Sequence, residues 1–247
     1  MNSRRITLVI FKRELKEIFT DPMLYILTTL FSFIMGWVFY SLLANSQHMT
    51  DTTMSNTVLK PLLGYINFLL MMFIPILSMK TFAGEYKEHT LSLYMMHKIP
   101  WRKLYWGKFL SLIVAVIFLL FPTVIFPFQL AFSGYSDWGV VITNYLGILF
   151  TAIAYLSVGI FASSLTSNMI IAVITSFSIL FGAILLAMSA SIISNFMLAQ
   201  MVGYLSFISH LQGFELGMIR SFDIFFYLSV TIFFSYLTVR SLDMRRF

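Results

Sequence analysis

The sequence of 247 residues contains no cysteine and little charge. Without cysteine there is no disulfide framework, no thiol nucleophile and no thiolate-bound metal. Asp, Glu, Lys and Arg together make up 11% of the residues, whereas apolar residues make up 59%. A soluble domain carries roughly a quarter charged residues, so this chain has too little polar surface to cover a water-facing globule. The composition therefore predicts an integral membrane protein.

Six apolar runs are each long enough for a membrane span, which needs about 20 apolar residues. The longest charge-free stretch, from Val140 to Ala190, has room for two spans, and we divide it at its polar cluster, residues 163–168. The sequence thus predicts an all-α integral membrane fold that forms a single transmembrane domain over residues 1–247. The expected transmembrane helices are 22–44, 61–79, 108–130, 140–162, 169–188 and 224–240.

Away from their ends, the expected spans contain no Asp, Glu, Lys, Arg or His. Their most polar interior groups are Asn67, Gln129 and Asn144. Ion-coupled transporters keep ionisable groups at membrane depth, and channels need a polar lining. We therefore do not expect this chain to use an ion gradient, or to form a channel, by itself.

Catalytic and nucleotide-binding motifs are also missing. The four histidines show no i, i+4 metal spacing, and Gly107-Lys108 lacks the preceding glycine of a phosphate-binding loop. His89 and His97 share a loop with Glu85 and Glu88, where solvated side chains are a simpler interpretation than a metal site. We expect no catalytic residue, no metal site and no cofactor in this chain.

Lysine and arginine are distributed unevenly between the two sides of the predicted membrane. Of the sixteen, only Lys60 and Arg220 lie on one side. The other fourteen (sixteen less two) lie in the N-terminal segment, the loop after the second span and the C-terminus. The positive-inside rule then places both termini in the cytoplasm. The net charge of +6 reflects this orientation, and nucleic acid is not an expected partner.

The N-terminal residues 1–21 predict an amphipathic helix in the membrane interface, with a frayed charged tail as the alternative. Asp21-Pro22 supplies a capping side chain and a proline for the first position of the next helix. The apolar positions of the segment recur at helical spacing, with the charges on the opposite side: Leu8, Phe11, Leu15 and Ile18.

Two segments outside the spans are too long for simple turns. Residues 191–223 are external yet strongly apolar, which predicts short helices at the outer interface or, alternatively, an extension of the fifth span. Residues 80–107 form a cytoplasmic loop rich in charge and aromatics, with a bend at Pro100. A membrane path without its own energy source implies a soluble partner, and a short helix in this loop would fit a partner's groove. A plain connecting loop is the alternative.

Several motifs occur in an order and spacing that resemble the permease subunits of ABC-2 type transporters. The sequence is most similar to the branch with the gliding-motility and nitrous-oxide-reductase-maturation permeases. It departs from that pattern at His89, where Gly is usual, and at Ser92 and Gly84, where Glu is usual. The matching motifs are Met79–Glu85, Thr90-Leu91, Pro100, Gly107-Lys108-Phe109, Tyr145–Leu149, Tyr155, Gly159–Thr166 with Asn168, and weakly His210, Phe214, Gly217, Asp223 and Tyr227.

The resemblance implies one half of a type V exporter-like transporter in the inner membrane of a bacterium. Two such permeases, forming a homodimer surrounded by lipid, would stand on two copies of a separate ABC ATP-binding subunit, which would hold the ATP and Mg²⁺. The alternative is an ABC complex that acts as a mechanical or signalling device without a released substrate. Small residues at four-residue spacing, such as Gly159 and Ser163 or Ala183 and Ala187, could serve the dimer contact or packing within one subunit.

The resemblance also implies roles for two sets of residues. The elbow helix would depend on Phe11, Arg13, Glu14, Asp21 and Pro22. Coupling to the ATP-binding subunit would depend on Phe82, Glu85, Lys87, Glu88, Thr90, Leu91, Leu93, Tyr94, Pro100 and Lys108.

Overall fold

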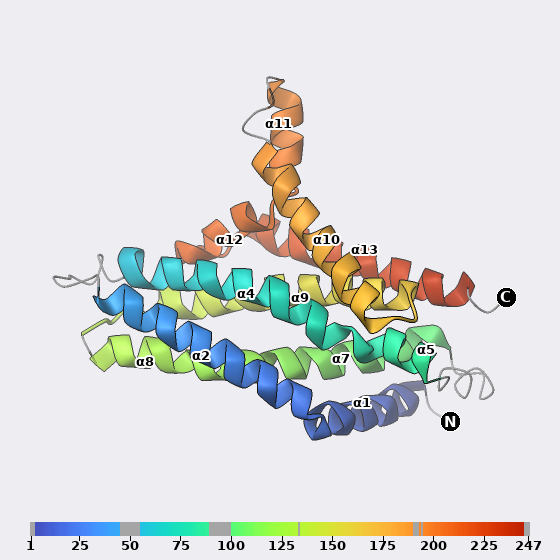
Figure 1. Cartoon of the computed structure of the whole chain (residues 1–247). Helices are drawn as coiled ribbons and strands as arrows, with labels where there is room; N and C mark the ends of the chain where they lie inside the picture. The colour runs from blue at the N-terminus through green and yellow to red at the C-terminus, as the bar shows by residue number, and fades with distance from the viewer. Residues whose placement is uncertain are drawn as a thin grey trace.

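The computed structural model describes residues 3–44, 55–88, 100–132, 134–189, 193 and 195–244. Within these residues the regular structure is entirely helical, and six helical stretches are long and apolar enough to cross a membrane (Figure 1). The predicted all-α fold with six spans is confirmed. The spans are Pro22–Ala44, Thr57–Lys87, Trp101–Phe132, Trp138–Leu165, Met169–Ser189 and Ser221–Met244.

The second and third spans are composite, and both are longer than predicted. The second joins a π-helical turn (Ser55–Leu59), α4 (Lys60–Ser78), a second π-helical turn (Lys80–Gly84) and α5 (Glu85–Lys87). The third joins α7 (Trp101–Leu120), a 3₁₀ turn (Phe121–Val124) and α8 (Ile125–Phe132).

Much of the segment 80–107, expected as a loop, is therefore helical. Its first part stays in the helix because Phe82 and Ala83 are buried against the bundle. Its last part is helical because Pro100, with φ −68° and ψ 130°, ends an extended segment and lets α7 begin at Trp101. The helix predicted in the middle of the loop falls in residues 89–99, outside the described residues.

The fourth span, α9 (Trp138–Leu165), is the most buried of the six and lies at the centre of the bundle. Glycines let its neighbours approach closely. A Cβ at Gly159 would lie 2.1 Å from Ser78 Oγ, and a Cβ at Gly147 would lie 2.7 Å from the Phe214 side chain. Gly159 thus serves packing within the subunit. The helix ends at Leu165, inside the polar cluster where the division was predicted.

Three spans form the periphery: α2 (Pro22–Ala44), α10 (Met169–Ser189) and α13 (Ser221–Met244). They expose large apolar side chains such as Phe33 and Phe225, which suits contact with lipid rather than water. The least buried of the six spans is α10, which leaves the bundle and rises away from it together with α11 (Figure 1).

The predicted short helices between the fifth and sixth spans are present. They are α11 (Phe196–Gly203), capped by the Asn195 side chain, and α12 (Phe207–Glu215), capped by Ser206. The alternative, a continuous extension of the fifth span, is not what forms, because α10 ends at Ser189. The amphipathic N-terminal segment is α1 (Ser3–Thr20), a helix that lies along α7 (Figure 1).

Candidate functional site

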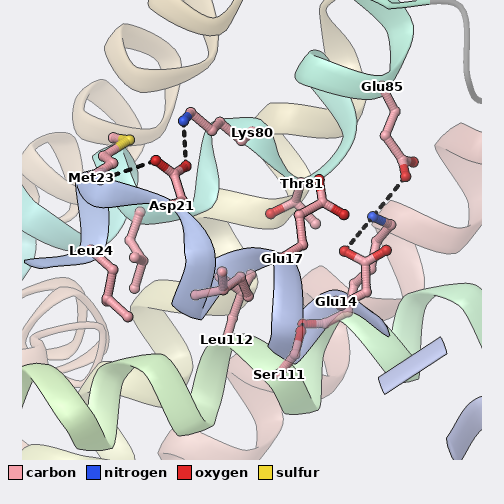
Figure 2. Close-up of a pocket in the computed structure, with 13 residues that line it drawn as sticks. Glu14, Glu17, Asp21, Met23, Leu24, Lys80, Thr81, Glu85, Ser111 and Leu112 are labelled. Atoms are coloured by element: carbon pink, nitrogen blue, oxygen red, sulfur yellow. Dashed lines mark hydrogen bonds and ion pairs between the residues drawn. The ribbon is translucent and has the colours of Figure 1, made fainter. Parts of the chain in front are cut away.

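Three ionic side chains from three different elements meet where α1, α5 and α7 converge. Lys108 Nζ lies 2.8 Å from Glu14 Oε2 and 2.9 Å from Glu85 Oε1 (Figure 2). The exposed fractions of these side chains are 3% for Lys108, 9% for Glu14 and 13% for Glu85. We call these three residues the ion cluster. It joins the N-terminal helix to the far end of the second span.

The position of the ion cluster depends on how α1 packs. Gly107 lets α1 approach α7, because a Cβ there would lie 2.6 Å from Ile10 Cγ2. One turn further along α1, Glu14 then faces Lys108. The predicted inner face of α1 is thus partly wrong: Leu8 is 53% exposed, whereas Ile10 and Glu14 are buried. Glu14 can turn inward, against the expected placement of charge, because Lys108 neutralises it.

A hydroxyl group from α9 holds the π-helical turn at Lys80–Gly84. Ser163 Oγ accepts hydrogen bonds from the backbone amides of Phe82, at 3.1 Å, and Ala83, at 3.0 Å. It also donates to the carbonyl of Met79, at 2.9 Å. A π turn forms i→i+5 rather than i→i+4 bonds, and such turns are frequent at functional sites. Ser163 therefore fixes the direction in which the chain continues to Glu85.

A second, more exposed ion pair joins the start of α2 to the π-helical turn. Lys80 donates a hydrogen bond to Asp21, and the Asp21 carboxylate also accepts one from the Met23 amide at 3.0 Å, which caps α2. Burial alone would raise the pKa of Asp21, but the Lys80 and Met23 hydrogen bonds outweigh it, so that this pKa lies below its ordinary value. Asp21 is therefore charged at neutral pH and keeps α1, α2 and the π turn together.

A small cavity opens between α1, the start of α2, the end of the second span and α7 (Figure 2). Its volume is about 80 Å³. Apolar side chains such as Leu24 and Leu112 form part of the wall. The charged side chains that line it are Glu14, Glu17, Asp21, Lys80, Glu85 and Lys108.

The residues expected to contact an ATP-binding subunit fall into three groups. Lys87, Glu88 and Pro100 are exposed, so they are accessible to a partner. Phe82 and Lys108 are buried, with Lys108 Nζ 5.8 Å from the Phe82 ring centre, so they support the segment from behind, as Glu85 largely does. Thr90, Leu91, Leu93 and Tyr94 lie outside the described residues.

The expected elbow residues also differ in their surroundings. Glu14 and Asp21 make the contacts described above, Phe11 is partly buried, and Arg13 and Pro22 are exposed. Sequence reasoning did not identify Gly107 or Ser163 as parts of the site. The available signal was a glycine beside a lysine at the start of an apolar run, and a serine in the motif that follows Gly159.

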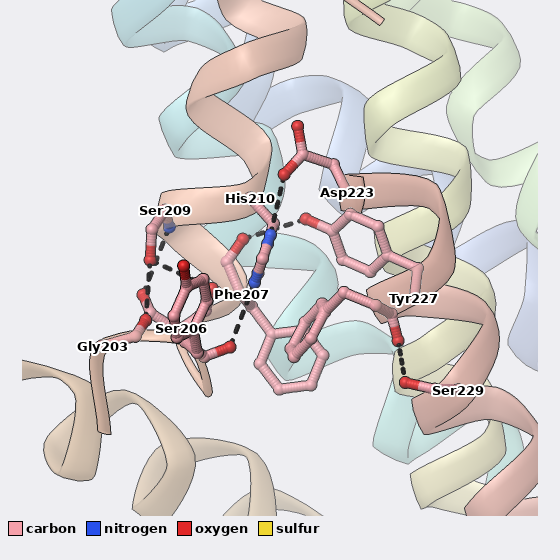
Figure 3. Close-up of polar contacts among 10 residues, drawn as sticks. Gly203, Ser206, Phe207, Ser209, His210, Asp223, Tyr227 and Ser229 are labelled. Atoms are coloured by element: carbon pink, nitrogen blue, oxygen red, sulfur yellow. Dashed lines mark hydrogen bonds and ion pairs between the residues drawn. The ribbon is translucent and has the colours of Figure 1, made fainter. Parts of the chain in front are cut away.

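A second polar cluster lies at the other end of the bundle, between α12 and α13 (Figure 3). His210 Nδ1 lies 2.8 Å from Asp223 Oδ1, and His210 Nε2 lies 3.0 Å from the carbonyl oxygen of Tyr204. The Tyr227 hydroxyl donates to the carbonyl of Phe207 at 2.9 Å. Because a carbonyl oxygen only accepts, Nε2 carries a hydrogen. These bonds fasten α12 to the start of α13.

Comparison with known proteins gives one match. A family model described as "ABC-2 family transporter protein" matches residues 8–216, from α1 through α12. No curated protein and no solved structure matches the chain. Within the described residues, no group of three His, Cys, Asp or Glu side chains could hold a metal ion.

Proposed function

The chain belongs to the ABC-2 transporter family, and from that premise we propose that it is an exporter permease driven by ATP-binding subunits. It is a multi-pass membrane component of such a transporter. Permeases of this family have no nucleotide-binding domain and generally pair with ABC ATPase subunits. ATP and Mg²⁺ would accordingly bind to the partner, two copies of which stand beneath two permeases. Both termini would lie in the cytoplasm of a bacterium.

One observation supports coupling at this site above all: the second span continues past its π turn and is fastened there on two sides. Lys108 links Glu85 to α1, and Ser163 links the turn to α9. A partner that moves the segment after Lys87 would therefore move α1 as well. Buried ion pairs and satisfied amides resist local bending, so the displacement passes into the spans.

The exposed end of this segment is the surface we assign to the ATP-binding subunit. Reversing the charge at Lys87, by Lys87→Glu, is expected to reduce the co-purifying ATPase about tenfold, because like charges across an interface repel. The measurement is mild-detergent purification of the tagged chain, expressed with its neighbouring genes, followed by quantification of the soluble ATPase. Arg220→Glu, an equal reversal on an exposed residue at the other end of the bundle, is the control. A chain that purifies without any soluble ATPase would overturn the proposed function.

Export is distinguished from a mechanical or signalling role by a second experiment. The assembled complex is reconstituted in sealed vesicles and supplied with ATP on the side of the ATP-binding subunits. Movement of a labelled compound across the bilayer that stops in Lys87→Glu supports export. ATP hydrolysis that changes the accessibility of single introduced cysteines, without movement of any compound, supports the mechanical role.

We further assign the contact between the two permeases to α10. This span is the least buried, rises away from the bundle and carries α11 with it, which leaves an apolar face wide enough for a second copy (Figure 1). Because the chain has no cysteine, a single Ile174→Cys substitution gives an unambiguous cross-linking test. We expect a disulfide-linked dimer from Ile174→Cys, 58% exposed in wild type, and none from Ile232→Cys on α13, 66% exposed. Equal cross-linking of both would contradict this seam.

A further inference from the structure

The cavity beside the ion cluster carries excess negative charge. Four carboxylates and two ammonium groups line it, which leaves two negative charges. Lys80 neutralises Asp21, and Lys108 is shared by Glu14 and Glu85, so one excess charge belongs to the buried ion cluster and one to Glu17. A net charge in such a place is costly unless a cation neutralises it.

One buried oxygen faces this cavity without a donor. Glu14 Oε2 contacts Lys108, whereas Glu14 Oε1 is buried and has no hydrogen-bond partner. The carboxylate of Glu14 lies at the cavity next to Lys108 (Figure 2). A charged oxygen left unpaired in a buried place loses its hydration without compensation. A cationic hydrogen-bond donor in the cavity would correct both the charge and the missing bond.

The size and lining of the cavity restrict the kind of cation. A volume of about 80 Å³ has room for a group as large as two or three water molecules, each of which takes about 30 Å³ in the liquid. No three acidic or histidine side chains converge as metal ligands in the described part of the chain. A primary ammonium group needs three acceptors, and Glu14 Oε1, Glu17 and the Thr81 hydroxyl all line the cavity. The chemistry favours an ammonium group over a metal ion.

A basic surface hollow adjoins the acidic cavity. It is lined by Arg13, Lys16, Glu17, Thr20 and Asp21, and it shares Glu17 and Asp21 with the cavity. Arginine and lysine side chains bind phosphate, so an anionic and a cationic subsite lie side by side at the end of the spans. On the membrane side, Leu24, Leu77 and Leu112 continue the cavity with apolar surface.

We propose that this cavity and hollow bind the headgroup of an aminophospholipid, that is, a phosphate diester that carries a primary ammonium group. The ammonium lies against Glu14 and Glu17, and the phosphate lies over Arg13 and Lys16. The glycerol backbone continues along the apolar wall. A lipid bound there connects α1, α2 and α7 and so stabilises the elbow helix against the bundle.

The test measures lipid binding to the full chain by native mass spectrometry after delipidation in detergent. Phosphatidylethanolamine and phosphatidylglycerol with identical acyl chains are added separately. We expect phosphatidylethanolamine to bind about tenfold more tightly to the wild type, as one charge-assisted hydrogen bond would give. Glu17→Gln, at the exposed rim, should abolish this preference, and Glu14→Gln should do the same in the buried part. Asp243→Asn, which neutralises an exposed carboxylate outside the cavity, should retain it.

Two results would overturn the proposal: equal affinity of the wild type for both lipids, or the same preference in Glu17→Gln as in Asp243→Asn. Soluble glycerophosphoethanolamine identifies the source of the headgroup. If it displaces the bound lipid, the site recognises the headgroup itself, including a free one. If only the intact lipid binds, the natural ligand is a phospholipid of the membrane.

Discussion

Replacing Lys108 with methionine is expected to lower the free energy of unfolding by about 3–5 kcal/mol. The substitution keeps the length and volume of the side chain but leaves the carboxylates of Glu14 and Glu85 buried without their shared cation. Both must then reach water or take up a proton, and either response loosens α1 and α5 from α7. The measurement is the thermal or denaturant unfolding midpoint of the purified chain in one detergent.

The control is Lys80→Met, the same chemical change at the exposed ion pair. The side chains of Lys80 and Asp21 are 45% and 28% exposed, so water compensates for a lost partner and the expected cost is below about 1 kcal/mol. Adding Glu14→Gln and Glu85→Gln to Lys108→Met should recover much of the loss, since no buried charge remains. Equal shifts of the midpoint for Lys108→Met and Lys80→Met would show that the ion cluster does not stabilise the fold.

Gly159→Ala is expected to cost about 1–3 kcal/mol, the usual range for overpacking a tight core. The new Cβ would lie 2.1 Å from Ser78 Oγ and 3.0 Å from Ser78 Cβ, so α9 and the end of α4 must separate. Because Ser163 lies one turn further along α9, this separation also pulls its hydroxyl from the amides of Phe82 and Ala83. We expect a lower unfolding midpoint together with weaker retention of the ATPase.

The matched control is Gly64→Ala in α4, where a Cβ meets nothing within 4 Å. Alanine is the better helix former by about 1 kcal/mol, so this variant should be neutral or slightly stabilised. Ser78→Ala combined with Gly159→Ala should recover part of the loss, because it removes the nearer contact and leaves the Cβ in place. If Gly159→Ala unfolded at the same midpoint as Gly64→Ala, the close approach of α9 to α4 would be incorrect.

The sequence alone predicted the membrane class and the six spans because both follow from local hydrophobicity. A bilayer requires about 20 apolar residues per span, and the runs of this chain satisfy that length one after another. Local capping chemistry was equally readable: Asp21-Pro22 begins α2, and the polar cluster after residue 162 ends α9. Proton, metal and nucleotide chemistry could be set aside because the residues for it are missing.

Only the tertiary structure decided which side chains form the site. Glu14 lies on an apolar face because Lys108, 94 residues away along the chain, neutralises it, and no periodicity within α1 contains that information. The second span continues past Met79 because Ser163, more than 80 residues later, satisfies the amides that the π turn leaves open. Helix length and amphipathicity are local properties, whereas a buried charge or a misaligned amide is tolerated only where a distant residue pairs with it.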